Sequence, residues 1–481
     1  MDLVATFILA LSVAIFLLSV FGLHLTLYAW EEPSRLDEGR APAKFARPRH
    51  SFTAILPARH EEGVIYETVR RVAGMRYPRR LVEIIVVCHV DDVRTIAEAQ
   101  RAARDIGDRN VRVMTFDTDP INKPHGLNVA LAAARRQFVT IFDAEDDVHP
   151  DLFRMVNTVL VQQQVRVVQA GVQLMNWNDR WFSLHNCLEY YFWFRSRLHF
   201  HARVGMIPLG GNTVFVRREL LLEVGGWDQE CLTEDADIGV RLSAMGERMS
   251  VVYDPVYVTR EETPDTVASW VRQRTRWNQG FVYVLRKGAW LHLPRLGQRL
   301  LALYTFSYPM LQALLFILWP TVVVGILLLK VPIPVALMSF LPLYALIFQL
   351  GIQVVGAVMF ASEYGIRLRP LTLLRLVVTF LPYQWLLGIS ALRAVYRELE
   401  IQLGWEKTHH AGAHRRERAN PPVATHLTAA AIMNTIAPPA VRGLAATVSD
   451  EAVRHCARCG RARPVRLRSC PACGFGSAVA Q

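Results

Sequence analysis

An acidic segment, FDAEDD, carries the residues best suited to chemistry in this chain. It places Asp143 and Glu145 two positions apart, with Asp146 and Asp147 directly behind them. Alternate carboxylates on an extended turn can share one hard divalent cation with the oxygens of a diphosphate. Such a cation would neutralise the charge of a nucleotide leaving group. An acidic cluster that only caps a helix remains the alternative for these residues taken alone.

A second segment, NKPHGLN, precedes the acidic one by about 20 residues and places Lys123 and Asn128 at the start of a predicted helix. A helix N-terminus offers free backbone N–H groups, and a nearby lysine adds positive charge, so this segment suits a phosphate. An ordinary capped helix start is the alternative.

Three further segments follow in the order LGGN (Leu209–Asn212), TED and QRTRW (Gln273–Trp277). In TED, Asp235 stands at the start of an amphipathic helix, where it could act as a base or cap the helix. In QRTRW, Arg276 and Trp277 could bind a charged substrate or form a cation–aromatic pair at a membrane surface. The order of all these segments within one domain favours the functional interpretation.

The elements that must position these residues alternate between apolar runs and helical stretches of roughly 20 to 25 residues. Near-continuous apolar runs of this length indicate buried parallel strands, and so a doubly wound α/β sheet with ligands at the carboxyl ends of its strands. The predicted strands are Ser51–Pro57, Val82–Cys88, Val111–Phe116, Phe138–Asp143 and Val165–Gly171.

Membrane anchors flank this predicted domain of residues 51–288. Hydrophobic residues form 52% of the 481-residue chain and charged residues 20%, which is too apolar for a soluble protein and too charged for a transporter alone. An N-terminal anchor is predicted over residues 1–30, because the apolar stretch is long enough to span and has no cleavage site. Residues 301–396 contain three more apolar stretches, Leu303–Leu329, Ile333–Phe360 and Leu371–Tyr396, after an amphipathic interfacial segment at 289–300.

The charge distribution predicts the orientation of these anchors. Five cations follow the first anchor, so the N-terminus is expected outside and the domain in the cytosol: Arg35, Arg40, Lys44, Arg47 and Arg49. Three later crossings would leave the C-terminus outside, yet the chain there is basic and rich in thiols. We therefore expect one of the three stretches to be re-entrant or interfacial, or the region 303–360 to contain an extra crossing.

The C-terminal region combines a predicted disordered linker, residues 409–453, with a cysteine motif at 454–475. From Glu406 onward there are eleven Lys and Arg against four acids, so most of the net charge of +12 lies here. The spacing C-x2-C-x10-C-x2-C of Cys456, Cys459, Cys470 and Cys473 is typical of a structural zinc site of the zinc-ribbon type. A protein partner or a nucleic acid could dock on such a ribbon through its arginines.

From about Phe52 to Gly288, the motifs together resemble those of the processive family 2 glycosyltransferases, the cellulose, hyaluronan, mannan and curdlan synthase group. WEKTHH (Trp405–His410) is similar to a feature of the bacterial members. The resemblance implies a nucleotide-diphospho-sugar transferase domain of the GT-A type, a Mg or Mn ion at the donor site, and an inverting transfer.

The resemblance also implies roles for individual residues. Asp143 and Glu145 match the metal motif, and Asp235 matches the general base, a role that contributes typically about 10²- to 10⁴-fold. Glu234, Gln273, Arg276 and Trp277 complete the catalytic set. The donor-binding set comprises Pro57, Arg59, Glu61, Asp91, Asp92, Lys123 and Asn128.

One departure concerns the second predicted strand, which in the family ends in a pair of aspartates that bind the base and the metal. Cys88 and His89 occupy the equivalent positions here, and the acidic pair Asp91 and Asp92 is displaced by three residues. The choice between UDP and GDP therefore stays open, with a UDP-sugar favoured.

These patterns predict a multi-pass enzyme of the inner (plasma) membrane, with its catalytic domain and C-terminus in the cytosol, that extends a polysaccharide from a nucleotide-diphospho-sugar. Two alternatives remain. One is single transfer to a lipid or glycolipid acceptor, and the other is an inactive membrane scaffold whose zinc ribbon binds a partner.

Overall fold

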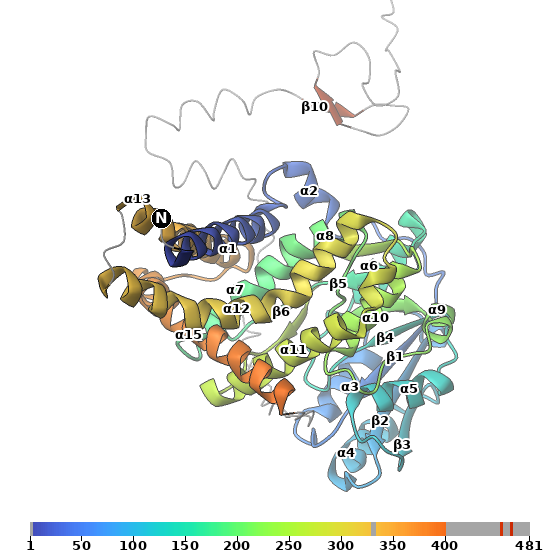
Figure 1. Cartoon of the computed structure of the whole chain (residues 1–481). Coiled ribbons are helices and arrows are strands. Elements are labelled where there is room, and N and C mark those ends of the chain that lie inside the picture. Colours follow the sequence, from blue (N-terminus) through green and yellow to red (C-terminus); the bar gives the residue numbers. More distant parts are fainter. Residues whose placement is uncertain (1–2, 329–332, 401–452, 456–461, 465–481) are drawn as a thin grey trace, which may run out of the picture. The chain divides into compact units, whose positions relative to one another are not determined.

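The computed structural model describes residues 3–328, 333–400, 453–455 and 462–464 (Figure 1). The chain divides into two compact units, Met1–Val423 and Ala424–Gln481. In the second unit, β10 (Val453–His455) pairs antiparallel with β11 (Ala462–Pro464). All four cysteines of the predicted zinc site lie outside the described residues.

A seven-stranded sheet forms the centre of the first unit, in the order β3-β2-β1-β4-β7-β5-β8. The first four predicted strands are present, and β1, β2, β3 and β4 run parallel. The strands of this sheet are β1 (Phe52–Pro57), β2 (Val82–His89), β3 (Val111–Phe116), β4 (Phe138–Ile141), β5 (Val167–Ala170), β7 (Val214–Arg217) and β8 (Met249–Val252).

The predicted strands did not include β7, which lies between β4 and β5 and runs antiparallel to both, so the sheet is mixed. A short apolar run carries no signal for its direction, because a strand buried on both faces has the same pattern either way. The predicted fifth strand also divides after Ala170. Its second part, β6 (Val172–Leu174), pairs with β9 (Thr259–Glu261) in a separate two-stranded sheet.

Helices cover both faces of the central sheet, as the apolar strands required. Along β1, Phe52, Ala54 and Leu56 belong to one hydrophobic core and Ile55 to the other. The first core is closed by α3 (Ile65–Ala73), α4 (Val93–Ile106) and α6 (Leu152–Gln163). The second is closed by α5 (Lys123–Ala133), α9 (Arg218–Glu223) and α10 (Glu234–Ala244).

Two further groups of helices connect the sheet to the apolar part of the chain. The first runs through α7 (Ser183–Phe192), the π-helical turn η2 (Trp193–Arg197) and α8 (Leu198–Val204). The second is α11 (Val267–Lys287), followed by the short turn η3 (Ala289–His292). Between α7 and α11, the carboxylate of Glu189 pairs with Arg274.

Four described helices are long and apolar enough to cross a membrane by length and composition. They are α1 (Leu3–Leu27), α12 (Leu296–Leu328), α14 (Leu341–Glu363) and α15 (Pro370–Leu399) (Figure 1). Two boundaries differ from those predicted. The segment 289–300 divides between η3 and the first turn of α12, and the stretch Ile333–Phe360 breaks between the short α13 (Ile333–Ser339) and α14, which has proline in its first turn. The short α2 (Pro33–Glu38) follows α1.

Candidate active site

A cavity of about 1380 Å³ opens at the carboxyl ends of β1 and β4, where the α/β sheet was predicted to bind its ligand. It is also lined by the starts of α5 and α10 and by the middle of α11. Eleven of the predicted donor, metal and catalytic residues line it: Pro57, Arg59, Glu61, Lys123, Asp143, Glu145, Glu234, Asp235, Gln273, Arg276 and Trp277.

The four acids of the segment after β4 form two pairs with different surroundings. Asp143 and Glu145 line the cavity. Asp146 is fully buried, and its carboxylate accepts hydrogen bonds from Nδ2 of Asn212 at 3.0 Å and from the backbone N–H of Asp143 at 2.9 Å. Burial, with the neighbouring carboxylates, raises the pKa of Asp146 well above its usual value. Asp147 pairs with Arg71 and is not among the residues that line the cavity. The second pair of acids therefore shapes the loop that presents the first.

Lys123 lies between Asp143, a predicted metal ligand, and Glu234, a member of the predicted catalytic set. It is the first residue of α5, whose cap is Asn122. Its Nζ lies 2.6 Å from Oδ1 of Asp143 and 3.9 Å from Oε1 of Glu234. Burial disfavours the ammonium, but the carboxylates of Asp143 and Glu234 outweigh burial and raise the pKa of Lys123. The lysine is thus a fixed positive charge at the donor end of the cavity.

Glu234 and Asp235 begin α10, and both side chains reach the cavity. Burial raises the pKa of Glu234 to about 7, with Lys123 opposing the shift and Asp235 adding to it. Burial also raises the pKa of Asp235. A buried carboxylate with a raised pKa is a stronger base than an exposed one, so the pair suits proton abstraction near neutral pH.

Glycines allow these elements to approach closely. A methyl group at Gly211, in the LGGN segment, would stand 3.1 Å from Oδ2 of Asp235 and 3.7 Å from Nζ of Lys123. A methyl group at Gly280 of α11 would stand 2.4 Å from Oγ1 of Thr233, the residue that precedes α10. Gly280 therefore lets α11 pack directly against the start of α10, which places QRTRW beside TED.

Within QRTRW, the three predicted residues and Arg274 line the cavity, and Arg274 also holds α11 in place. The guanidinium of Arg274 lies 4.6 Å from the ring centre of Trp277 and 5.1 Å from that of Trp270. The same guanidinium pairs with Glu189 of α7. Arg276 lies in the field of Glu234, Asp143 and Asp235, although burial lowers its pKa. It supplies a second positive charge to the cavity.

Three predicted donor residues do not line the cavity. Asn128 exchanges two hydrogen bonds with the backbone of Trp227, at 2.7 and 2.8 Å. Asp92 caps α4 by accepting from the backbone N–H of Thr95, and its second oxygen accepts from the N–H of His60 at 2.5 Å. Asp91 pairs with Arg59 and His89. Asn128 matched the family motif and the pair Asp91 and Asp92 was displaced from it, and all three side chains form hydrogen bonds or ion pairs with nearby loops.

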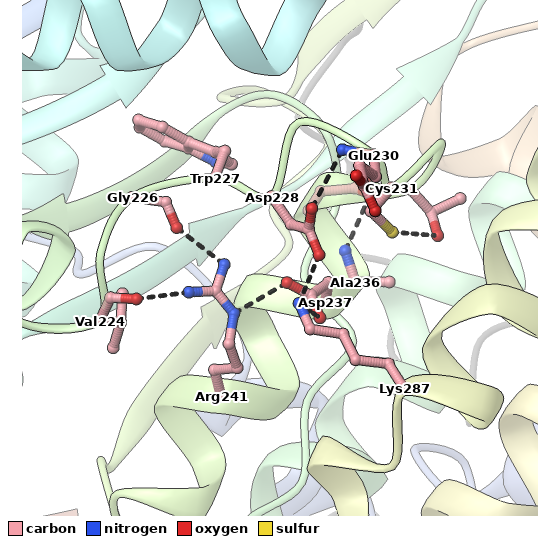
Figure 2. A network of polar contacts seen from close by, with 12 residues as sticks. Val224, Gly226, Trp227, Asp228, Glu230, Cys231, Ala236, Asp237, Arg241 and Lys287 are labelled. Carbon is pink, nitrogen blue, oxygen red and sulfur yellow. Dashed lines mark hydrogen bonds and ion pairs between the residues drawn. The ribbon is translucent and has the colours of Figure 1, made fainter.

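A polar network beside α10 accounts for another acid near the base. Asp237 is fully buried and pairs with Arg241 at 2.8 Å and with Lys287 at 2.8 Å (Figure 2). Arg241 also donates to the carbonyls of Val224 and Gly226. Asp237 is therefore a structural residue, and of the two aspartates on this helix only Asp235 faces the cavity.

Sequence analysis missed several polar residues that the fold brings to the cavity: Glu189, Tyr190, Asn212, Glu261 and Glu262. Asn212 links Asp146 to Glu261 by donating to both carboxylates. The LGGN motif was a signal for Asn212. Glu261 and Glu262 lie in the short run TREE. Its sequence has no feature that distinguishes it from an ordinary exposed acidic turn.

The cavity residues are compatible with a divalent cation at the donor site. Among the described residues, no group of three or more His, Cys, Asp or Glu side chains is placed to hold an ion alone. Mg²⁺ and similar ions are commonly held by one or two carboxylates together with substrate phosphates. Asp143 and Glu145 would provide the two carboxylates, and a diphosphate beside Lys123 would provide the remaining oxygens.

The other end of the same cavity is apolar and lies among the membrane-type helices. Ile15 and Leu18 of α1 line it, together with Leu315 and Phe316 of α12 and Leu346 of α14. One continuous space therefore connects the charged residues to a wall of apolar side chains.

Comparisons with known proteins found chains that are similar to this one. Residues 48–280 match the family described as "Glycosyltransferase like family 2". A probable glycosyltransferase, YdaM, of Bacillus subtilis is 26% identical over 256 residues, which are 49% of this chain and 56% of YdaM. A beta-monoglucosyldiacylglycerol synthase of Trichormus variabilis is 27% identical over 49% of this chain and 52% of its own length. The chain thus matches about half the length of these curated relatives.

Two other similarities extend further along the chain. A beta-monoglucosyldiacylglycerol synthase of Synechocystis is 26% identical over 82% of each protein. A mannosyltransferase structure from Pyrobaculum calidifontis, in complex with GDP-Man and Mn2+, matches 82% of this chain and 99% of its own, with a TM-score of 0.49 and 19% identity. The family match over residues 48–280 indicates a glycosyltransferase family 2 domain in that part of the chain.

Proposed function

We propose that this protein transfers a sugar, with inversion, from a nucleotide-diphospho-sugar to a hydroxyl group of a membrane-held acceptor. The observation that carries this proposal is the single cavity that Asp235 shares with the charged donor residues and with the apolar wall. A base in that position can meet a donor from the cytosol and an acceptor from the membrane in the same space.

The proposed reaction follows from the charges in the cavity. Asp235 takes the proton of the acceptor hydroxyl while the hydroxyl oxygen attacks the anomeric carbon and the diphosphate leaves from the opposite face. Lys123 and Arg276 offset the negative charge that grows on the diphosphate. A Mg or Mn ion at Asp143 and Glu145 would supply further charge neutralisation when bound. Asp143 also orients Lys123, through the contact of 2.6 Å.

A lipid is the acceptor class that the geometry supports best. The apolar wall comes from helices α1, α12 and α14, so an acyl chain can occupy it while the lipid head group reaches Asp235. The name of the Synechocystis relative, which aligns over 82% of this chain, is consistent with a glycerolipid.

A growing polysaccharide is the second candidate, and a specific set of residues favours it. The membrane-side part of the cavity also contains amide side chains, Gln312, Gln349 and Gln384, and the aromatic Trp385. Amides bind sugar hydroxyls and aromatic rings stack on sugar rings. A poly-beta-1,6-N-acetyl-D-glucosamine synthase of Staphylococcus epidermidis is 22% identical over 55% of this chain.

We also propose that α15 lies in the plane of the membrane surface and does not cross. Its polar contacts with α7 and α11 run from Thr379, 3.0 Å from Nε2 of His185, to Arg397, whose Nε is 2.9 Å from Oε1 of Gln279. Those contacts span about 27 Å of helix at about 1.5 Å per residue. If α15 crossed the bilayer, only one end of the helix could contact the catalytic domain.

The opposite face of α15 supports this placement. It exposes one continuous apolar stripe with spacings of three and four residues: Leu371, Leu374, Val378, Leu381, Trp385, Ile389, Leu392, Tyr396 and Leu399. With α15 at the surface, α1, α12 and α14 are the described helices that cross. The catalytic domain and the C-terminus are then both cytosolic, which removes the conflict in the predicted orientation.

The test of the proposed function is an incubation of the membrane-reconstituted full chain with labelled UDP- and GDP-sugars, Mn²⁺ and diacylglycerol vesicles. A labelled product that moves with lipid supports the lipid acceptor, and a product of high mass supports the polysaccharide. If no combination of donor and acceptor gives either product, the proposal is contradicted.

A further inference from the structure

An arginine lines the membrane end of the cavity and has only neutral partners in the part of the chain that the structure describes. Arg197 is the last residue of the π-helical turn η2. Its guanidinium donates to Oγ1 of Thr26 at 2.9 and 3.1 Å and to the carbonyl of Gly22 at 3.4 Å, both in α1. Among the described residues, no acid forms an ion pair with it. The described chain therefore leaves its positive charge without a counter-charge.

The other arginine of η2 has the surroundings of a structural cation. Arg195 is buried, lies 2.9 Å from Oε1 of Glu363 at the end of α14, and does not line the cavity. A cation among apolar helices is costly without a partner, so an uncompensated one marks a functional position. π-Helical turns are also frequent at functional sites. Arg197, unlike Arg195, therefore has the surroundings of a binding residue.

The position of Arg197 along α1 indicates the side from which its anion comes. Ile15 and Leu18 belong to the apolar wall of the cavity. Gly22 and Thr26, which contact Arg197, lie closer to the end of α1 that leads into the catalytic domain. At about 1.5 Å per residue, they stand about 6 Å and about 12 Å beyond Leu18. A lipid with its chains against the apolar wall therefore places its head group beside Arg197.

Two tyrosines of α12 complete this subsite. Tyr304 stands so close to α1 that a methyl group at Gly22 would lie 2.7 Å from its Oη. Tyr308, one turn further along α12, lines the same end of the cavity. A hydroxyl group can donate to a phosphate oxygen, and a guanidinium can donate two parallel hydrogen bonds to one phosphate. The chemistry of these side chains therefore suits a phosphate group.

We infer that Arg197 binds the phosphate of an acidic phospholipid, so that the cavity selects such a lipid over neutral diacylglycerol as its acceptor. The inference rests on the proposed function, because it takes the bound lipid to be the acceptor. The donor diphosphate has its own cations, Lys123 and Arg276, at the other end of the cavity. The apolar wall then holds the lipid chains, Arg197 holds the phosphate, and the head group beyond the phosphate extends toward Asp235.

Lipid binding by the full-length protein in detergent tests this subsite without any sugar donor. Phosphatidylglycerol and diacylglycerol with identical chains are titrated in turn, and native mass spectrometry counts the bound lipid. We expect phosphatidylglycerol to bind at least about tenfold more tightly, the effect of one charge-assisted hydrogen bond. Arg197→Gln keeps an N–H donor but carries no charge. It should weaken phosphatidylglycerol about tenfold and leave diacylglycerol unchanged.

Two further variants separate the charge from packing. Arg197→Lys keeps the positive charge and should keep most of the preference. Arg203→Gln is the matched control, because Arg203 of α8 also lacks an ion pair within the described chain and donates to Oη of Tyr28 at 3.4 Å, yet does not line the cavity. This control should leave both affinities unchanged. Excess inorganic phosphate should not displace phosphatidylglycerol, because it has no chains to occupy the apolar wall.

Photo-crosslinking of the unchanged protein gives a second measurement that does not depend on the folding of a variant. A phosphatidylglycerol with a photoreactive group in its head group should attach to residues 22–26 of α1 or to η2. Cross-links that avoid both segments would overturn the inference.

The outcomes distinguish the inference from the proposed function. Equal binding of the two lipids, or displacement by inorganic phosphate, would overturn the inference. An equal loss of both lipids in Arg197→Gln would show that the arginine only holds α1, and would also overturn it. With a labelled nucleotide-sugar added, equal transfer to both lipids would overturn the inference and leave glycosyl transfer intact. A preference for phosphatidylglycerol without any sugar transfer would contradict the proposed function and leave the phosphate subsite in place.

Discussion

At the scale of single residues, Asp143 of the acidic segment provides a test of the proposed donor site. Asp143→Asn removes one carboxylate of the proposed cation site and weakens the hold on Lys123, 2.6 Å away. We expect sugar transfer to fall by at least about 10²-fold, because charge neutralisation at the leaving group is lost. The fold should persist, since Asp143 lies at the cavity and not in the core.

The measurement is turnover with labelled donor, together with Mn²⁺ binding by calorimetry. Asp117→Asn makes the same chemical change at an exposed position after β3 and should leave both unchanged. Full activity of Asp143→Asn, or of the unchanged protein in EDTA, would remove the cation from the proposed reaction.

Asp235 and Asp237 form a matched pair of aspartates on α10. Asp235→Asn should lower kcat by about 10²- to 10⁴-fold and change donor affinity by less than about tenfold, because a base acts mainly in the transition state. Asp237→Asn breaks contacts with Arg241 and Lys287, so it should lower thermal stability instead. Normal turnover by Asp235→Asn would assign the base to another residue.

The pH dependence of kcat follows from the same pair. A base must be ionised, and burial raises the pKa of Asp235 and raises that of Glu234 to about 7. Activity should therefore fall as the pH decreases from neutral, well above the pH at which an exposed aspartate is protonated. Glu234→Gln removes the neighbouring negative charge and should move this acid limb to lower pH. If the acid limb does not move in Glu234→Gln, the charge of Glu234 does not influence the pKa of the base.

At the scale of elements, the contact between α10 and α11 positions Asp235, the proposed base. Gly280→Ala places a methyl group against Thr233, at a starting distance of 2.4 Å, and displaces the start of α10. We expect a loss of stability of about 1–3 kcal/mol, typical of overpacking, together with a lower kcat. Differential scanning calorimetry of the protein in detergent measures the loss of stability, and turnover assays measure kcat.

The control for this substitution is Gly297→Ala in α12, where an added methyl group meets no atom within 4 Å. It should preserve both stability and activity, because alanine is the better helix former. If Gly280→Ala preserved stability and kcat as Gly297→Ala is expected to do, the packing of α11 against α10 would not position the proposed base.

At the scale of the whole molecule, the placement of α15 predicts the depth of its residues. Nitroxide labels at Leu371→Cys, Trp385→Cys and Leu399→Cys should report one common depth near the bilayer surface. A chain that ends at residue 453 serves as the background, because its remaining cysteines, Cys88, Cys187 and Cys231, are buried. A crossing helix would give a shallow label at each end and a deep one at Trp385.

The C-terminal unit leads to a separate prediction. Deletion of residues 454–481 should remove one equivalent of bound zinc, as the spacing of Cys456, Cys459, Cys470 and Cys473 predicts. Transfer should be retained, because the cavity and its contacts lie within the first unit. Metal analysis and turnover of the inserted truncation check both statements. A complete loss of transfer would make this unit part of the enzyme.

The sequence by itself determined the kind of domain, eleven of the residues that line the cavity and the apolar helices. Buried strands must be apolar and charged cavity residues must follow them, so the order of motifs was sufficient to predict that Asp143, Lys123 and Asp235 meet. These patterns are local and do not depend on how distant segments pack.

Only the tertiary structure decided the features that depend on partners far along the chain. The antiparallel direction of β7, the hydrogen bonds that join Asn128 to Trp227 and Asp92 to His60, and the contact of α15 with α7 and α11 have no local pattern. An apolar helix looks the same to hydropathy whether it crosses a bilayer or lies on its surface. What distinguishes the two is the second face of the helix, and only packing against the catalytic domain shows what that face contacts.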